Sequence, residues 1–386
     1  MIENGFTFLT LLIFISSTIV MIEAKTNYKI FNYLPSIVII YFLVMLLSTF
    51  EVWQKSEEIN NMYKIVKSNL LPAMIFLMLL LADLREIFKL GKKMILTFLL
   101  SSFSIAIGFI GMFALLHTYF EPNAWKSFSA LSGSWMGGTA NMVAIQGALK
   151  LPDSAMGYTL LIDSIDYSIW VMILLALVPF AKRFNQWTQA DTSMIDEVGA
   201  KLAQKGKERK SPSFHSIFFL LGISLLVSVI SQYSSSFLPT NDFLTSNTWI
   251  VIISTFLGIF FAITPLSKIS GSSELSNIML YLIVALIASR ANFSELQEAP
   301  LYIMAGFLIL FIHILIMIIF SKLFKLDLFT IGVASLANIG GIASAPILAS
   351  AYSKSLIPIG ILMAMMGYIL GTFGGLMVGK ILEMMA

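Results

Sequence analysis

The chain consists of a series of apolar stretches, each close to the length of one bilayer crossing. A helix needs about 20 apolar residues to cross the hydrocarbon core. The stretches lie near 6–22, 31–50, 69–82, 94–118, 157–180, 214–236, 248–266, 275–290, 301–321 and 355–381. Because lipid offers the backbone no hydrogen-bond partners, segments of this kind cross as helices. The sequence therefore predicts an all-α integral membrane protein.

Composition supports this class and excludes others. Hydrophobic residues make up 58% of the chain and charged residues 12%, whereas soluble domains carry roughly a quarter charged residues. The absence of Cys excludes disulfides and thiolate metal sites, and a formal charge of +3 is too small to indicate a nucleic-acid partner. No signal-peptide pattern surrounds the first stretch, so we expect it to be retained as a helix. We expect a multi-pass protein of the cell inner (plasma) membrane.

The stretches form two sets of five in the same order, which indicates an internal repeat. Between the fourth and fifth stretch of each set lies a small-residue segment with a glycine pair, Gly137-Gly138 or Gly340-Gly341. Hydrocarbon tolerates interrupted backbone only beside protein or a watery cavity, so such segments are typical of binding sites. The predicted divisions are a first transmembrane repeat at 1–181 with its broken segment at 128–149, a linker at 182–213, and a second transmembrane repeat at 214–386 with its broken segment at 328–350.

The linker is rich in basic residues, which predicts a cytoplasmic location by the positive-inside rule. These residues are Lys182, Arg183, Lys201, Lys205, Lys207, Arg209 and Lys210. Met194, Val198 and Leu202 recur every four residues after a candidate cap at Asp191, which favours a short amphipathic helix on the inner leaflet. A solvated charged loop fits the same residues equally well.

Topology depends on whether the glycine-pair segments cross the bilayer. If they enter and return, each half has five crossings, and the halves are inverted repeats with both chain ends outside. If both segments cross, twelve helices form parallel halves. We favour the inverted form, because it brings the basic residues between Arg85 and Lys93 to the cytoplasmic side, directly beside helix ends.

Three ionisable residues lie deep in apolar stretches, where charge is costly and usually functional: Asp163, Asp166 and His313. Asp163 and Asp166 are three residues apart, which puts both carboxylates on one helix face. They follow the first broken segment, so we expect both to couple a cation, Na⁺ or H⁺, with Asn141 as a further ligand. Two aspartates facing water are the simpler alternative. For His313 we expect a packing or helix–helix hydrogen-bonding role, with a proton relay as the alternative. For Arg290 we expect snorkelling to the interface, with a substrate contact as the alternative.

The broken segments supply the predicted substrate contacts. Carboxylate, amide and hydroxyl oxygens with unwound backbone suit cations, and new helix starts after the glycines suit an anion. The candidates are Ser134, Gly137, Gly138, Thr139, Asn141, Gln146, Asn338, Gly340, Gly341 and Ser344. Close helix packing is the alternative role for glycine. It is the role we assign to Gly367, Gly371, Gly375 and Gly379, which recur every four residues.

The segments SGSWMGGTANMVAI and LANIGGIASAPILASAYSKSLIPIG resemble a bacterial membrane-protein family catalogued as domain of unknown function 819, over nearly the whole chain. That family is more distantly similar to sodium-coupled glutamate and citrate symporters, in which two inverted five-span halves each carry a Gly-Gly re-entrant loop. Only Gly137, Gly138, Gly340 and Gly341 match the symporters' motif. The resemblance implies an elevator-type carrier that forms homodimers.

We expect a secondary active transporter of a small anionic solute, coupled to Na⁺ or H⁺. A glutamate-like carboxylate, an amino acid or a small acidic peptide follows only from the distant resemblance. A cation/proton antiporter or solute exporter is the alternative within this class, and a non-transporting membrane scaffold or regulatory protein is the alternative outside it. We expect no enzymatic activity and no cofactor beyond a coupling ion, since the chain has neither the Gly-x-Gly-Asp motif of an intramembrane aspartyl protease nor a Walker motif.

Overall fold

The computed structural model describes residues 1–26, 28, 31, 35–54, 56–82, 84–192, 195, 211–241, 244–293 and 299–386. Within these ranges the protein is helical, with one isolated backbone bridge between Ile2 and Trp53 and no β-strand. The α-helices are α1 (Gly5–Lys25), α2 (Ser36–Thr49), α3 (Glu57–Leu80), α4 (Leu84–Ile87), α5 (Lys92–Leu116), α6 (Ala124–Gly137), α7 (Thr139–Leu149), α8 (Met156–Leu177), α9 (Ala181–Thr188), α11 (Phe214–Ser235), α12 (Ser246–Ala262), α13 (Ser272–Ala288), α14 (Ala299–Leu323), α15 (Leu328–Ile339), α16 (Gly341–Tyr352) and α17 (Ile357–Glu383).

Among the described residues, seven helical segments are long and apolar enough to cross a membrane. They contain α1, α3, α5, α8, α11, α14 and α17. Three further predicted stretches correspond to shorter helices, α2, α12 and α13, of 14, 17 and 17 residues. At about 1.5 Å per residue these fall short of the roughly 30 Å hydrocarbon core. A multi-pass α-helical membrane protein is thus established, while the inverted repeats and the inside–outside orientation stay predictions.

One helix begins well before its apolar stretch. The hydropathy pattern places the third stretch at 69–82, but α3 begins at Glu57. Ser56 caps it by accepting a hydrogen bond from the Ile59 amide at 3.3 Å, and Glu57 and Glu58 complement the helix dipole in the first turn. Hydropathy cannot detect this polar first half, because its stability comes from capping and from contacts with other helices.

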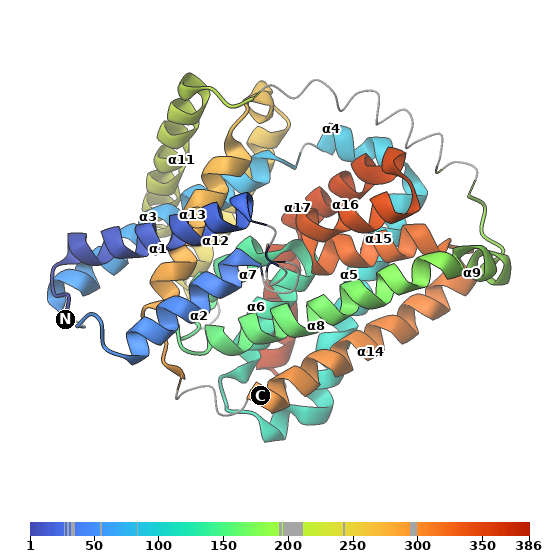
Figure 1. Ribbon diagram of the computed structural model, residues 1–386, viewed down its shortest axis with the longest axis horizontal. Coiled ribbons are helices and arrows are strands. Elements are labelled where there is room, and N and C mark those ends of the chain that lie inside the picture. Colours follow the sequence, from blue (N-terminus) through green and yellow to red (C-terminus); the bar gives the residue numbers. More distant parts are fainter. Residues whose placement is uncertain are drawn as a thin grey trace.

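The helices pack into two groups (Figure 1). The first group contains α1, α2, α3, α11, α12 and α13, with α3 packed against the last three of these. The second group contains α5, α6, α7, α8, α14, α15, α16 and α17, and the contact between α6 and α17 is its most extensive. Each sequence half therefore contributes the helices of its first three apolar stretches to the first group, and its broken segment with the helices of its last two stretches to the second.

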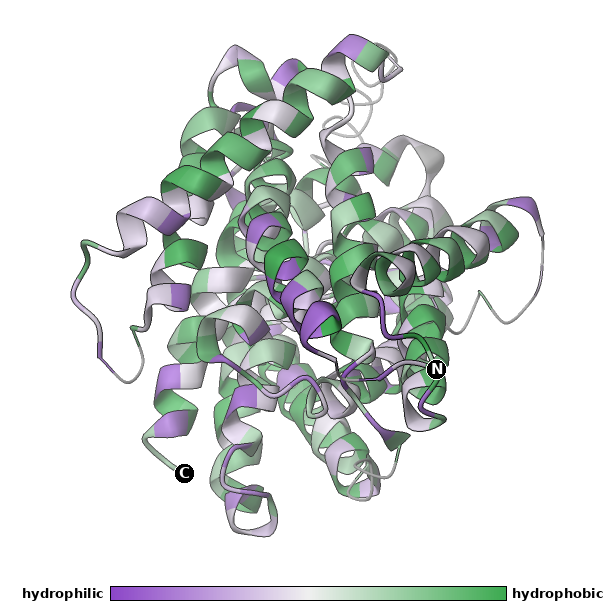
Figure 2. Ribbon diagram, turned by 90° about the vertical axis from the view of Figure 1, so that its left-hand side faces the viewer, coloured by the Kyte–Doolittle hydropathy of each residue, from purple (hydrophilic) through white to green (hydrophobic). Residues whose placement is uncertain are grey.

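The short helices beside the glycine pairs lie at the centre of the second group. Every residue of α15 is buried, and so is every residue of α6 except Lys126. Apolar side chains cover the outside instead: Phe214, Phe218 and Leu226 of α11 are exposed. In Figure 2 apolar residues extend along most helices, and hydrophilic residues concentrate near helix ends and connections. Such a surface suits contact with lipid.

The glycine repeat of α17 is a packing seam, as the sequence predicts. A Cβ atom added at Gly375 would lie 2.9 Å from the Gly133 Cα, and one added at Gly371 would lie 2.8 Å from the Gly137 Cα. Glycine lets the α6 and α17 backbones approach this closely. The seam fixes where the end of α6 meets α17.

The beginning of the linker is helical. In α9 the Asn185 side chain accepts a hydrogen bond from the Leu328 amide at 2.9 Å, which joins the linker to the start of α15. The predicted amphipathic helix through Met194, Val198 and Leu202 lies outside the described residues.

Candidate functional site

Each glycine pair ends one short helix and starts another. Gly138 separates α6 from α7 with φ +91°, and Gly341 starts α16 with φ +58° after α15 has ended at Ile339. These left-handed backbone angles favour glycine at the second position of each pair. In both cases the two short helices also pack against each other. The sequence prediction of a broken helix at each pair is therefore matched, whereas re-entry into a membrane stays a prediction.

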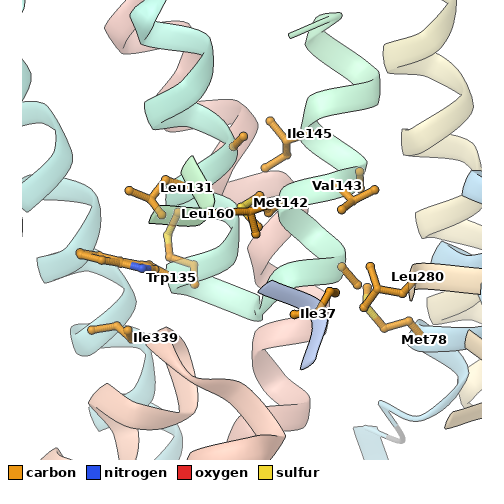
Figure 3. Packing of buried hydrophobic residues seen from close by; sticks show 14 of the residues in the cluster. Ile37, Met78, Leu131, Trp135, Met142, Val143, Ile145, Leu160, Leu280 and Ile339 are labelled. Carbon is orange, nitrogen blue, oxygen red and sulfur yellow. The ribbon is translucent and has the colours of Figure 1, made fainter. Parts of the chain in front are cut away.

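The two breaks come together at the middle of α17. A Cβ added at Gly367 would lie 3.0 Å from the Gly137 Cα and 3.5 Å from the Ala337 carbonyl oxygen, so this one glycine touches both broken segments. In Figure 3 Trp135, near the end of α6, lies close to Ile339, at the end of α15. The site is thus shared by both halves of the sequence.

Asp163 of α8 faces this meeting point. Its Oδ1 atom accepts hydrogen bonds from the Ser134 hydroxyl and the Trp135 indole N–H, both at 3.1 Å. The side chain is only partly buried. These neutral donors favour the carboxylate form of Asp163 without cancelling its charge.

The two amides in the broken segments connect them to neighbouring helices. Asn141 donates to the Gly137 carbonyl oxygen at 2.7 Å and accepts from the Thr372 hydroxyl at 2.6 Å. Asn338 accepts from the Ser102 hydroxyl at 2.6 Å and donates to the Ala334 carbonyl oxygen at 2.9 Å. Both side chains are fully buried. In this arrangement they hold the breaks in place, and binding a ligand would require exchanging these bonds.

The second break is closely packed at Gly340. A Cβ at Gly340 would overlap the Ser344 hydroxyl and the ring of Tyr167 on α8. A larger residue at 340 would therefore displace one of them, whereas a Cβ added at Gly341 would have no neighbour within 4 Å. Thr139, at the start of α7, is partly exposed beside the first break. The predicted contacts Ser134, Gly137, Gly138, Thr139, Asn141, Asn338, Gly340, Gly341 and Ser344 all lie at or next to the two breaks.

Two predicted site residues lie elsewhere. Gln146 is at the far end of α7, where its amide donates to the Leu151 carbonyl oxygen and to Asp153 Oδ1, both at 2.9 Å. Asp166 is fully buried, which rules out the alternative that both aspartates face water, and its carboxylate lies against Gly306 of α14. Residue spacing places a side chain on a helix face but does not say which neighbouring helix that face meets.

Gln146 belongs to a polar cluster between the two helix groups. Asp153, in the α7–α8 connection, pairs with Lys67 of α3 at 3.0 Å and accepts from the Tyr63 hydroxyl at 2.7 Å. The Arg290 guanidinium lies over the Tyr63 ring, 4.7 Å from its centroid. Arg290 therefore has an aromatic partner, while its snorkelling to the interface stays a prediction. Sequence reasoning missed this cluster, because Lys67 and Asp153 sit near the ends of apolar stretches, where charges are ordinary.

His313 has the role expected of it. Its Nδ1 is 2.7 Å from the Ser104 hydroxyl and its Nε2 is 2.8 Å from the Ser335 hydroxyl, so α14 is bonded to α5 and α15. The ring is fully buried and also contacts Trp170 edge to face. Both nitrogens are satisfied, which is the pattern of a helix-to-helix connection.

Comparison with known proteins identifies the family of the chain. A sequence profile described as "Protein of unknown function (DUF819)" matches residues 10–385. The uncharacterized membrane protein YjcL of Bacillus subtilis (strain 168) is 27% identical over 338 residues, which cover 83% of this chain and 84% of YjcL. The profile match over residues 10–385 includes both glycine pairs, α8 and all but the first residues of the two helix groups. The chain is a multi-pass membrane protein that belongs to the DUF819 family.

Proposed function

We propose that the protein is a secondary active transporter for a small anionic solute, of the glutamate-like carboxylate, amino-acid or small acidic-peptide class, coupled to Na⁺ or H⁺. The observation that carries this proposal is the meeting of two broken helices at one point of α17 beside the Asp163 carboxylate. In transporters, paired breaks of this kind expose helix ends and backbone oxygens to solute and ion.

The charges at the breaks suit an anion that moves together with a cation. The first turns of α7 and α16 begin at the breaks, and helix N-termini attract negative groups. Asp163 would repel an anionic solute unless a cation or proton neutralised it. Simultaneous binding of both would resolve this repulsion, which is the electrostatic basis of symport.

The unequal docking of the two broken segments supports alternating access. In Figure 3 Met78 and Leu280, both from the first group, lie beside α7, and α7 packs against α3, α12 and α13. Its counterpart α16 packs against α15, α17 and α8 of its own group. A symmetric scaffold with one docked and one undocked segment is what one end state of a two-state carrier would look like.

The exposure of matching residues follows the same asymmetry. Aligning Gly137 with Gly340 gives an offset of 340 − 137 = 203 residues. It pairs the buried residues Ala140, Ala144 and Ala148 with the exposed residues Ala343, Ile347 and Ala351. We therefore propose re-entrant segments in inverted halves, and an elevator-type movement in which α16 docks on the first group as α7 undocks.

A cation/proton antiporter or exporter is the second candidate, and one observation favours it. Residues 127–149, 151–181, 326–353 and 355–379, which contain the broken segments, α8 and most of α17, include no Lys or Arg. An anionic solute would have to be held by helix ends and hydroxyls alone. A site for cations would need only Asp163 and neighbouring oxygens.

A two-step experiment tests the proposal. Thermal unfolding of detergent-purified protein is first screened with Na⁺, Li⁺, carboxylates and amino acids, since a ligand of the native state raises its stability. The stabilising solute, in labelled form, is then offered to proteoliposomes under imposed Na⁺ or pH gradients. We expect gradient-driven uptake that Asp163→Asn abolishes and that Glu121→Gln, at an exposed carboxylate, leaves unchanged. Flux that ignores both gradients, or normal uptake by Asp163→Asn, contradicts the proposal.

A further inference from the structure

Asp166 is a buried acid that the site described above does not use. It lies one turn after Asp163 on α8 and points toward α14. A Cβ atom added at Gly306 would overlap both the Asp166 carboxylate and the Ile162 side chain. The missing side chain at 306 thus provides the space that the carboxyl group occupies against the α14 backbone.

The carboxyl group has no partner inside the protein. Asp166 is 0% exposed, and neither of its oxygens has a hydrogen-bond partner. Asp163 differs, because it has two donors and partial exposure. A bare carboxylate removed from both water and donors is strongly disfavoured, so a group in this position becomes neutral by taking up a proton or a cation.

The surrounding charges do not neutralise it. Residues 151–181 of the α8 region and 299–321 of α14 contain no Lys or Arg. The titratable groups on these two helices near Asp166 are Asp163, Tyr158, Tyr167, His313 and Tyr302. His313 is bonded to two serines, Tyr302 is stacked on Tyr158, and the Tyr167 ring lies against Gly340. The remaining charge, on Asp163, has the same sign and adds to the need for neutralisation.

The neighbours of Asp166 favour a proton over a metal cation. Hard cations need several oxygen ligands, whereas Gly306 and Ile162 present none from their side chains. Among the described residues, no group of three or more His, Cys, Asp or Glu side chains could hold a metal ion. A proton needs only one carboxyl oxygen and no coordination shell.

We propose that Asp166 is the binding site of the coupling proton. The inference rests on the proposed transport function and decides between its two coupling ions. One Oδ atom takes a proton from water in one state of the transport cycle and returns it to water in the other, so one proton crosses for each cycle. Asp163, one turn away on the same helix, is partly exposed, whereas Asp166 is fully buried.

Infrared spectroscopy of the purified full chain tests this without a transport assay. A protonated carboxyl group gives a carbonyl stretching band that a carboxylate does not give. We expect this band in the wild type at neutral pH, its loss in Asp166→Asn, and its retention in Asp163→Asn and Glu121→Gln. Replacing choline chloride by sodium chloride should leave the band unchanged. A band that Asp166→Asn does not remove, or that Na⁺ abolishes, overturns the proposal.

A second variant covers failure of Asp166→Asn to fold. Gly306→Ala crowds the carboxyl group without removing it, so we expect the band to shift, and an unshifted band contradicts the assignment. If the band is absent while gradient-driven uptake is measured, the transport function is supported and the proposed role of Asp166 is contradicted. If the band is present and no uptake is found, the protonation of Asp166 is supported, but both its coupling role and the proposed function are contradicted.

Discussion

Breaking the ion pair between Lys67 and Asp153 should destabilise the contact between the two helix groups. Asp153 accepts from Lys67 at 3.0 Å, from Tyr63 at 2.7 Å and from Gln146 at 2.9 Å, and thereby joins α3 to the α7–α8 connection. Asp153→Asn keeps the size of the side chain but removes its charge. The Lys67 ammonium would then lose its counter-ion in a mostly buried position.

The expected magnitude follows from the burial of the two side chains. Removing one partner of a fully buried pair costs about 3–5 kcal/mol, whereas exposed pairs contribute about 0.2–1 kcal/mol. The side chains of Lys67 and Asp153 are 16% and 20% exposed, so the pair lies between these limits. We expect a coupling energy of about 1–3 kcal/mol between the two positions.

A double-mutant cycle measures this coupling. Lys67→Met, Asp153→Asn and the double variant are compared with the wild type by denaturant unfolding of the detergent-purified protein, followed by circular dichroism. The pair Lys380 and Glu383 is the control: it is 2.7 Å apart, three residues apart on α17, and 53% and 25% exposed, so its coupling should stay below about 1 kcal/mol. If the Lys67–Asp153 coupling is no larger than that of the control pair, the cluster does not hold the groups together as reasoned.

Two further predictions concern the broken segments. Thr372→Val removes the donor to Asn141 and should lower the free energy of unfolding by about 0.6–1.7 kcal/mol, the range for hydrogen bonds between membrane helices. Thr372→Ser should restore most of this loss, and equal effects of the two substitutions would contradict the role of the hydroxyl. The chain has no Cys, so single cysteines report accessibility directly. Ile347→Cys, at a position 55% exposed, should react with a small maleimide at least about 10-fold faster than Ala144→Cys, at a position 0% exposed. Equal rates would mean that α7 and α16 are docked equally.

Some of the fold and the site is predictable from the sequence because it depends on local pattern. Each of the ten apolar stretches corresponds to a helix, and each glycine pair coincides with a helix break. The four-residue glycine repeat of α17 predicts its packing seam, since one small residue per turn leaves a groove along one helix face. The proximity of Asp163 to Ser134 was also predictable, because α8 follows the first broken segment directly along the chain.

Other features escaped prediction because they depend on contacts between distant residues. The polar first half of α3 has no hydropathy signal, although Ser56 followed by two glutamates is a recognisable helix start. Thr372 and Ser102, which hold Asn141 and Asn338, look like ordinary small polar residues of apolar helices. Only their partners, more than 200 residues away in the sequence, give them a role.

The sequence by itself determined the class of protein, the helix breaks and the acidic pair of α8, because hydropathy, glycine and spacing act within one segment. Tertiary structure decided that the two breaks meet at α17 and that the two aspartates face different neighbours. It also decided that α7 packs against α3, α12 and α13 of the first group, whereas the main contacts of α16 among the described residues are with α15, α17 and α8. Asp163 meets hydrogen-bond donors and Asp166 meets Gly306. The physical reason is that Asp163 and Asp166, three residues apart on α8, point toward different neighbouring helices. Which groups each carboxyl contacts depends on how those helices pack against α8.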